Sequence, residues 1–316
     1  CPRLERWEGD GDRAAFGRPR AAHAVLGVHR GLFLAAATDP VIAGAGQDGG
    51  LASALLIYAL EHGHLDAAVV SAADPGQRPR ALLAHNRAEV LAAAGSRYTY
   101  SSHVLAAAAA KGAARLGLVG VGCHVSIPHV ARARGARRAA RPFALTIGLL
   151  CTRTFTDDLF TGLLAGRYGV PREAIVRVNI KGKLQVWTAS PFDGSPDLEV
   201  PLKECDPFDR PGCRYCPDFT AQHADISLGG LGQHPRTTLA IVRSAAAADL
   251  LRAMADAGWI TLRDATVEDP EAVALITRMA GRQRRRWAAL AAADPRIDPG
   301  PGQAAVDPSG GPLSPP

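Results

Sequence analysis

Two cysteines stand close together in RPGCRYCPDFT, residues 210–220, where Cys213 and Cys216 lie between a Pro-Gly turn and an apolar Phe. Thiols at this spacing can form a disulfide, bind a zinc ion or ligate an iron-sulfur cluster. No signal peptide is visible, so we expect a cytoplasmic protein. In the reducing cytosol, metal or redox chemistry is a commoner use of such a pair than a disulfide.

Two further cysteines each end a short, continuously apolar run. These runs are RLGLVGVGC, which ends at Cys123, and PFALTIGLLC, which ends at Cys151. Runs of this kind are typical of neighbouring buried strands in an α/β sheet, and the carboxyl ends of parallel strands share one edge. We therefore expect Cys123 and Cys151 to approach each other, although a buried structural cysteine is the alternative for either position.

The cysteine spacing leaves three alternatives open. A 4Fe-4S cluster needs four thiolates from any part of the chain, and the close pair plus the two strand-end cysteines supply that number. A zinc ribbon usually has two close pairs, and a thioredoxin-type dithiol begins a helix that follows a strand, which this loop does not. Cluster, zinc and no metal all remain possible at this point, and Cys205 is expected to be a free thiol.

Two glycine-containing loops have the composition of ligand sites. In GAGQDGGLASALLIYALEHG, residues 44–63, glycines surround Gln47 and Asp48 ahead of an apolar pattern with helical spacing. A loop that opens a helix offers free N–H groups to a phosphate or an anionic flavin ring, but an ordinary capped helix has the same pattern. Residues 95–102 form a second loop, dense in donors, which suits ligand contact or a simple turn.

The elements that would position these residues alternate between strands and helices. We predict a strand over 65–72, a hairpin over 176–188 that turns at Gly182, and a strand over 236–245. Amphipathic patterns predict helices over 247–258 and 267–292. The fold class is therefore mixed α/β, with buried, mostly parallel strands, helices and a cysteine-bearing loop region. The expected parts are an irregular segment 1–30, an N-terminal part 31–110, a C-terminal part 111–292 and a disordered Pro/Gly-rich tail 293–316.

Composition narrows the class of protein further. The 316 residues are 47% hydrophobic and 21% charged, and the net charge of +6 is carried mainly by arginine. Two arginine clusters, residues 132–141 and 281–287, suit a solvated surface, an anionic cofactor tail or an acidic partner. Nucleic acid is disfavoured because aromatic residues, at 5%, are not interleaved with the arginines. No apolar run reaches the ~18 residues that a membrane span needs.

An ordered set of motifs resembles the coenzyme F420 hydrogenase/dehydrogenase beta subunit family over approximately residues 30–245. The motifs are GQDGG, LAAAGSRYTYS, GVGC, ALTIGLLC, NIKGK, PLKE and CRYCPDFTAQHADISLGGLG. The resemblance implies an oxidoreductase that binds FAD and a 4Fe-4S cluster and exchanges a hydride with coenzyme F420. It departs from many relatives at Gly122-Cys123-His124, where they have Pro-Cys-Gln, which leaves the substrate open. Because Cys1-Pro2 matches the usual end of a ferredoxin-like cysteine series, residues 1–30 are expected to be a remnant of such a region.

The resemblance also assigns residues to the two cofactors. It implies that the cluster ligands are Cys123, Cys151, Cys213 and Cys216. It implies a flavin site in residues 31–110 and the NIKGK hairpin, with the glycine loop SLGGLG beside the flavin; the site residues are Gly46, Gln47, Asp48, Gly49, Gly50, Ser96, Arg97, Tyr98, Thr99, Ser101, Lys181 and Lys183. The lysines or the arginine clusters would receive the phosphate and carboxylates of coenzyme F420. The expected partner is a redox subunit or a ferredoxin; a related reductase with another donor, or a zinc-stabilised binding module, is the alternative.

Overall fold

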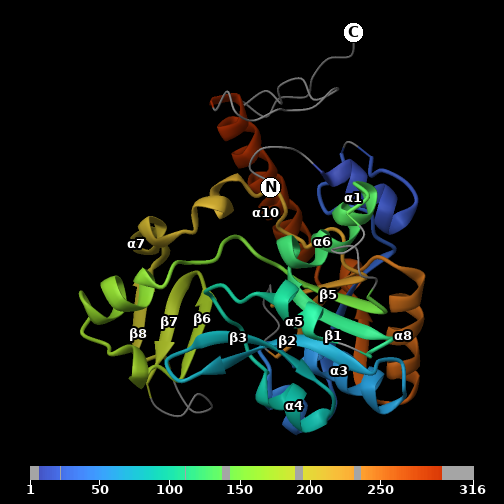
Figure 1. The fold of residues 1–316 in the computed structure, drawn as a ribbon, viewed down its shortest axis with the longest axis horizontal. Coiled ribbons are helices and arrows are strands. Elements are labelled where there is room, and N and C mark those ends of the chain that lie inside the picture. The colour runs from blue at the N-terminus through green and yellow to red at the C-terminus, as the bar shows by residue number, and fades with distance from the viewer. Residues whose placement is uncertain are drawn as a thin grey trace.

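A mixed eight-stranded sheet lies at the centre of the computed structural model, which describes residues 7–21, 23–110, 112–136, 143–188, 195–230 and 236–293 (Figure 1). Its strands are β1 (Gly31–Ala37), β2 (Ala67–Asp74), β3 (Arg78–Ala84), β4 (Leu116–Val121), β5 (Leu145–Leu149), β9 (Ile226–Gly229), β10 (Thr238–Val242) and β11 (Ile260–Asp264). Their order across the sheet is β11-β1-β10-β9-β5-β4-β2-β3.

The central strands of this sheet are parallel and the flanking strands are antiparallel. β2, β4, β5 and β9 pair in parallel, whereas β3 on one side and β10, β1 and β11 on the other pair antiparallel. Gly117 lies opposite Leu145 and Val121 opposite Leu149, so the two apolar runs that end in cysteines are neighbouring parallel strands, as predicted. The predicted mixed α/β class is confirmed.

Helices cover both faces of the sheet because its strands alternate their side chains between two cores. In β1, Phe33 and Ala35 pack with α3 (Leu51–Glu61), α4 (Arg87–Ala92) and α8 (Ala245–Asp256). On the other face, Leu32 and Leu34 pack with α10 (Pro270–Ala293), and β2 and β4 pack with α5 (His103–Ala109) and α6 (Gly122–Ala133). The short helices α2 (Pro40–Ala45) and α9 (Ala265–Glu268) follow β1 and β11.

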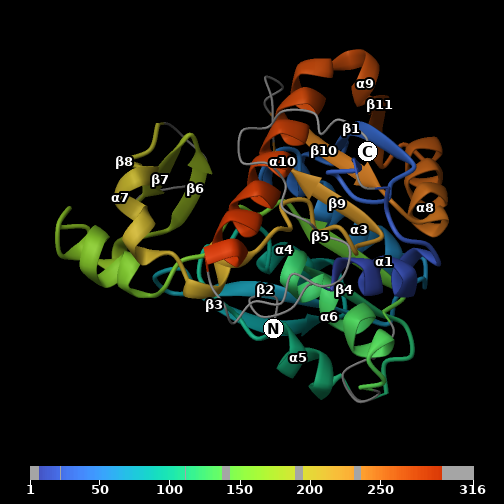
Figure 2. The ribbon, with the colours of Figure 1, turned by 90° about the horizontal axis from the view of Figure 1, so that it is seen from above.

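A smaller antiparallel sheet lies at one side of the main sheet in both ribbon views (Figures 1 and 2). Its strands are β6 (Arg177–Lys181), β7 (Lys183–Trp187) and β8 (Leu198–Pro201), followed by α7 (Leu202–Cys205). The predicted hairpin turn is confirmed at Gly182, whose φ is 72°. This sheet has its own core, formed with a π-helical segment, Leu159–Ala165.

The structure differs from the predicted elements in several places. The segment 1–30, predicted to be irregular, contains α1 (Glu8–Phe16), which packs against α6. The single helix predicted over 267–292 is divided at Asp269, which has φ −147° before Pro270, because a residue that precedes proline is pushed out of the helical region. The strand β3 and the π-helical segment were not predicted.

Some predictions fall outside the residues that the structure describes. These are the remnant at Cys1-Pro2, residues 137–141 of the arginine cluster 132–141, the end of the SLGGLG loop and the tail beyond Ala293. Of the helices described here, none combines the length and the apolar character that a membrane span requires.

Candidate cofactor site at the carboxyl edge of the sheet

Cys123, Cys151 and the glycine loop all follow strands at one edge of the main sheet. Cys123 lies in the first turn of α6 directly after β4, and Cys151 lies two residues after β5. The glycine loop 46–50 comes after β1, which runs in the same direction as β5 because two antiparallel pairings and one parallel pairing separate them. This is the edge where α/β sheets usually place their ligands.

The structure brings Cys123, Cys151, Cys213 and Cys216 together. Although Cys123 is exposed as a residue, loss of water around its thiol, and then the neighbouring Cys213, raises the pKa of Cys123 to about 11. Burial, Cys123 and Cys213 raise the pKa of Cys151 well above its usual value. Burial, Asp218 and Cys123 do the same for the pKa of Cys216. None of the four cysteines forms a disulfide bond among the described residues. As thiolates they would repel one another, and a cationic metal centre would relieve that repulsion.

Backbone groups surround the same sulfur atoms. The amide of Thr154 donates to Cys213 Sγ at 3.4 Å, and the sulfurs of Cys151 and Cys216 face the carbonyl oxygens of Arg153 at 3.5 Å and Asp218 at 3.7 Å. N–H donation to a ligand sulfur is a common means of tuning a cluster. Four thiols with such a donor match the ligand number of a 4Fe-4S cluster. Among the described residues, no group of three or more His, Cys, Asp or Glu side chains is arranged to hold a metal ion.

Gly122 allows the cysteine-bearing segments to approach closely. A Cβ atom at this position would lie 2.3 Å from Asp218 Oδ2. The Asp218 carboxylate accepts the backbone N–H of Gln222 at 3.1 Å, which holds the carboxylate in place. Because Gly122 has no side chain, the segment after Cys216 can pack against the residue that precedes Cys123.

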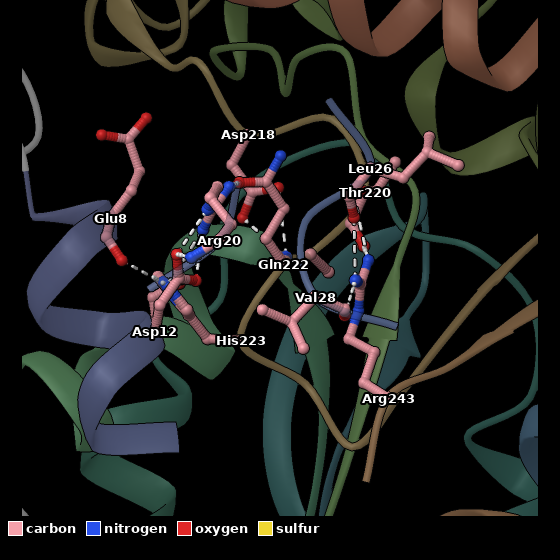
Figure 3. Close-up of polar contacts among 12 residues, drawn as sticks. Glu8, Asp12, Arg20, Leu26, Val28, Asp218, Thr220, Gln222, His223 and Arg243 are labelled. Carbon is pink, nitrogen blue, oxygen red and sulfur yellow. Dashed lines mark hydrogen bonds and ion pairs between the residues drawn. The ribbon is translucent and has the colours of Figure 1, made fainter. Parts of the chain in front are cut away.

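A buried polar network fixes the segment that follows Cys216 (Figure 3). Asp12 of α1 is fully buried and accepts from Arg20 Nη2 at 2.6 Å, and the guanidinium of Arg20 also donates to Gln222 Oε1. His223 lies 3.3 Å from the Asp12 carboxylate through Nε2 and 2.8 Å from the Ser126 hydroxyl of α6 through Nδ1. The network thus ties α1, α6 and the cysteine-bearing segment to one another.

Arg243 anchors the same segment from the opposite side (Figure 3). Its guanidinium donates to the carbonyl oxygens of Leu26 at 2.8 Å, Val28 at 2.7 Å and Thr220 at 3.0 Å. Burial lowers the pKa of Arg243 to about 9. A fully buried arginine that satisfies three carbonyl groups ties together loops that lie outside the helices and strands.

The glycine loop has a backbone that only glycine adopts easily. Asp48, Gly49 and Gly50 have φ of 49°, 89° and 68°. A Cβ at Gly50 would lie 2.3 Å from the carbonyl oxygen of Ile42, and one at Gly49 equally close to that of Arg236. Gly50 is the N-cap of α3, so the predicted glycine loop at a helix amino terminus is present.

The hairpin and the polar loop meet the glycine loop through side chains. Ser96 Oγ donates to Gln47 Oε1 at 2.7 Å, and Lys181 Nζ donates to Asp48 Oδ1 at 2.8 Å. Asp48 also packs against Gly230, where a Cβ would meet its carboxylate. Three of the predicted flavin segments therefore converge with the glycine that follows β9.

Tyr98 lies between the polar loop and the hairpin. Its hydroxyl accepts the Ile180 N–H at 3.1 Å and lies 3.3 Å from Asn179 Oδ1. Burial raises the pKa of Tyr98 to about 12. Two neighbouring polar atoms, Arg97 Nε and Thr99 Oγ1, are buried without a hydrogen-bond partner among the described residues. Unpaired buried donors are uncommon in folded proteins, so they fit a site that receives a polar cofactor.

Two predicted residues are placed apart from this convergence. Lys183 Nζ donates to Glu199 at 2.8 Å and its side chain is half exposed, so the structure does not join it to the glycine loop. Ser101 bonds to the hydroxyl of Ser71 at 3.0 Å on β2. Cys205 is buried in the core of the small sheet and, like the four predicted ligands, forms no disulfide bond among the described residues.

Sequence reasoning missed several groups beside the cysteines. Arg210 stacks over the ring of Tyr100 at 4.3 Å, and its charge opposes the rise in the pKa of Cys123. His124 lies 4.1 Å from the ring of His103, and both of its ring nitrogens lack a partner in the described structure. Burial, with His103 and Arg210, lowers the pKa of His124 to about 3. Proximity in sequence to Cys123 and Cys213 was the available signal for His124 and Arg210.

Comparison with known proteins places this chain in a family. The profile of the coenzyme F420 hydrogenase/dehydrogenase beta subunit N-terminus matches residues 32–108, and that of the C terminus matches residues 113–268. The coenzyme F420 hydrogenase beta subunit of Methanothermobacter thermautotrophicus is 31% identical over 74% of this chain and 84% of its own length. That of Methanosarcina barkeri is 30% identical over 66% of this chain and 73% of its own length.

The fold is shared with a solved structure. A chain of the F420-reducing [NiFe] hydrogenase complex from Methanosarcina barkeri superposes with a TM-score of 0.78 and 25% sequence identity, covering 85% of this chain and 94% of that one. Two adjacent profile matches and relatives above 30% identity agree with this likeness. The chain belongs to the coenzyme F420 hydrogenase/dehydrogenase beta subunit family and is an oxidoreductase of that type.

Proposed function

We propose that the chain passes electrons between coenzyme F420 and a 4Fe-4S cluster through FAD, as the beta subunit of a hydrogenase or dehydrogenase complex. Membership of the family, whose named relatives are F420 hydrogenase beta subunits, supports the link to coenzyme F420. The observation that carries the proposal is the position of the four-cysteine group and the glycine loop along one edge of the same sheet.

The cysteines have the role of cluster ligands in this proposal. The thiolates of Cys123, Cys151, Cys213 and Cys216 would hold the cluster, and the Thr154 N–H would tune it through the bond to Cys213 Sγ at 3.4 Å. Gly122 and the Asp12 network keep the two cysteine-bearing segments in register, so the protein supplies a preformed site.

The flavin would be held by the convergence of the glycine loop, the polar loop and the hairpin. The free N–H groups ahead of α3 and the ammonium of Lys181 suit anionic cofactor groups, while the unpaired Thr99 hydroxyl can bond to a polar edge. FAD supplies the exchange between a hydride and single electrons, and a 4Fe-4S cluster supplies single-electron transfer. The residues of this site orient the groups and exclude water.

The remaining assignments belong to the same proposal. A hydride carrier with phosphate and carboxylate groups, as coenzyme F420 has, would be received by Lys181 at the glycine loop rather than by the arginines of α10, which lie beside the four-cysteine group. Lys183 keeps this role only if its pair with Glu199 opens. A ferredoxin or a redox subunit would be the electron partner. A related FAD/iron-sulfur reductase is the second candidate, because Gly122-Cys123-His124 departs from the pattern of many relatives.

A matched pair of cysteine variants tests the proposal. Purified protein is examined anaerobically for its visible spectrum and for iron, sulfide, zinc and flavin, then titrated with reduced coenzyme F420. We expect flavin, about four irons per chain and bleaching of the flavin by reduced F420. Cys213→Ser should lose most of the iron, whereas Cys205→Ser, which changes a buried thiol outside the group, should retain it. Zinc without flavin or iron would overturn the redox function and favour a zinc-stabilised binding module.

A further inference from the structure

Helix α10 forms a wall of the four-cysteine group. Gln283 is buried and its Nε2 donates to the carbonyl oxygen of Thr152 at 3.3 Å, directly after Cys151. Arg284 donates to Gln222 Oε1 at 3.2 Å, and α10 contacts the segment Pro211–Tyr215, which contains Cys213. Figure 2 shows α10 beside this segment. The helix therefore connects the cysteine group to the outer surface.

The outer side of α10 carries arginines on one face. Arg278, Arg282, Arg285 and Arg286 follow one another at spacings of four, three and one residues, which places them along one side of a helix. Arg278, Arg282 and Arg285 are exposed and Arg286 is half-buried. In Figure 1 α10 lies on the outside of the molecule, and the face is accessible because Arg278, Arg282 and Arg285 are exposed. We call these four residues the arginine face.

The charge of the arginine face is not neutralised. No salt bridge joins any of its four guanidinium groups to a carboxylate within the described ranges, whereas other exposed arginines, such as Arg80 and Arg252, are paired. Arg286, at the inner side of the face, lies near the charges of Arg153 and Arg282 and also near the carboxylates of Asp209 and Asp206, so the unrelieved charge belongs mainly to the three exposed arginines. Unrelieved like charges on a surface helix weaken the free protein slightly and favour an anionic partner.

We propose that the arginine face docks an acidic electron-transfer protein beside the four-cysteine group, which deepens and rests on the proposed function. One electron would pass between this centre and the oxidised or reduced iron-sulfur centre of the partner, with no bond formed and no proton moved. Electrostatic complementarity fits this class of partner because redox proteins meet through small, transient interfaces that rely on charge for rapid association. A charged helix next to the four-cysteine group would both attract the acidic partner and orient its iron-sulfur centre toward that group.

Charge-reversal variants of the intact, cofactor-loaded protein test the proposal. The probe is an acidic two-cluster bacterial ferredoxin, and binding is measured by biolayer interferometry. In the triple variant Arg278→Glu, Arg282→Glu and Arg285→Glu, the affinity should fall at least about tenfold, while the corresponding triple Arg→Lys variant should stay within about threefold of wild type. Wild-type binding should also weaken by at least about tenfold between about 50 mM and about 500 mM salt.

A control triple variant distinguishes the effect of the arginine face on binding from the effect of the net charge of the protein. Arg30→Glu, Arg80→Glu and Arg252→Glu change the net charge equally, but Arg30 lies at the opposite edge of the sheet, Arg80 on the edge strand β3 and Arg252 on the opposite helix layer. This triple should bind ferredoxin within about twofold of wild type. An equal loss in both triples, or no measurable ferredoxin binding by wild type, would overturn the docking face. Tighter binding of a short DNA duplex than of ferredoxin would overturn it in favour of nucleic acid.

A dye assay keeps this test distinct from the test of the proposed function. Reduction of benzyl viologen by reduced coenzyme F420 needs no protein partner, so the arginine-face variant should keep wild-type rates in it while its ferredoxin reduction falls about tenfold. A wild-type protein that binds ferredoxin through the face but fails the dye assay would contradict the proposed function alone. Loss of dye reduction together with ferredoxin reduction in the variant would contradict the docking role.

Discussion

At the scale of single residues, the buried carboxylate of Asp12 joins α1 to the segment that follows Cys216, through Arg20 and His223. Burial alone would raise its pKa, but hydrogen bonds from His223 and Arg20, and the charge of Arg20, outweigh burial and hold the pKa well below its ordinary value of 3.8. A depressed folded-state pKa stabilises the fold above that ordinary value, and this stabilisation is lost as the pH falls below it. The pH dependence is therefore a direct test of the network.

We predict that Asp12→Asn lowers the free energy of unfolding by about 3–5 kcal/mol at neutral pH, because it leaves the buried charge of Arg20 without its partner. The difference from wild type should shrink as the pH falls below 3.8. Urea unfolding of the variant and the wild type at a series of pH values measures this difference in the free energy of unfolding. Asp249→Asn, which breaks an exposed pair with Arg252, is the control and should change stability by less than about 1 kcal/mol. A difference that is constant with pH would contradict the role given to Asp12.

At the scale of elements, the glycine loop and its helix provide a matched pair of positions. Gly50 and Gly63 lie at opposite ends of α3 with nearly equal φ of 68° and 67°. They differ in surroundings, because a Cβ at Gly50 meets the carbonyl of Ile42 whereas one at Gly63 meets no atom within 4 Å. A substitution would therefore strain the backbone at both positions, but it would cause a steric clash only at Gly50.

We predict that Gly63→Ala destabilises the protein by about 1–2 kcal/mol, the usual cost of a left-handed non-glycine residue. Gly50→Ala should cost more than about 3 kcal/mol and weaken flavin retention, because the loop must move away from Ile42. Thermal unfolding and flavin content of the two variants measure this. Equal losses at both positions would show that backbone strain alone governs the loop.

At the scale of the whole molecule, the proposed cofactor segments are distant in sequence but share one edge of one sheet. Residues 46–50, 95–102 and 210–218 reach that edge from different elements, while β4 and β5 lie in the core behind it. The edge consists mainly of loops with few backbone bonds of their own, so its order should depend on what it binds.

We predict that removing iron and flavin increases hydrogen exchange in these three segments together and leaves β4 and β5 protected. Exchange measured by mass spectrometry on loaded and stripped protein checks this. Refilling with FAD alone should restore protection at 46–50 and 95–102 more than at 210–218. Uniform loss of protection across the sheet would instead mean that the cofactors stabilise the whole fold.

The sequence by itself determined the parts of this protein that depend on local pattern. Continuous apolar runs predicted β4 and β5 as neighbours, because only strands buried on both faces lack alternation. Glycines predicted the turn at Gly182 and the loop ahead of α3, because positive φ restricts the residue type. Parallel pairing predicted that Cys123 and Cys151 lie near each other, whereas the addition of Cys213 and Cys216 to the same group was implied by the family resemblance.

Tertiary structure alone decided the rest, since it depends on partners far away in the chain. Helix α1 has a weak sequence signal and is held by the contacts of Asp12 with Arg20 and His223. The sequence motif gives no reason to distinguish Lys181 from Lys183, which lie on adjacent strands of the hairpin. In the structure Lys181 donates to Asp48, whereas Lys183 donates to Glu199. Burial and pairing across the sheet, which no local pattern encodes, placed these groups and set α10 against the cysteine-bearing segment.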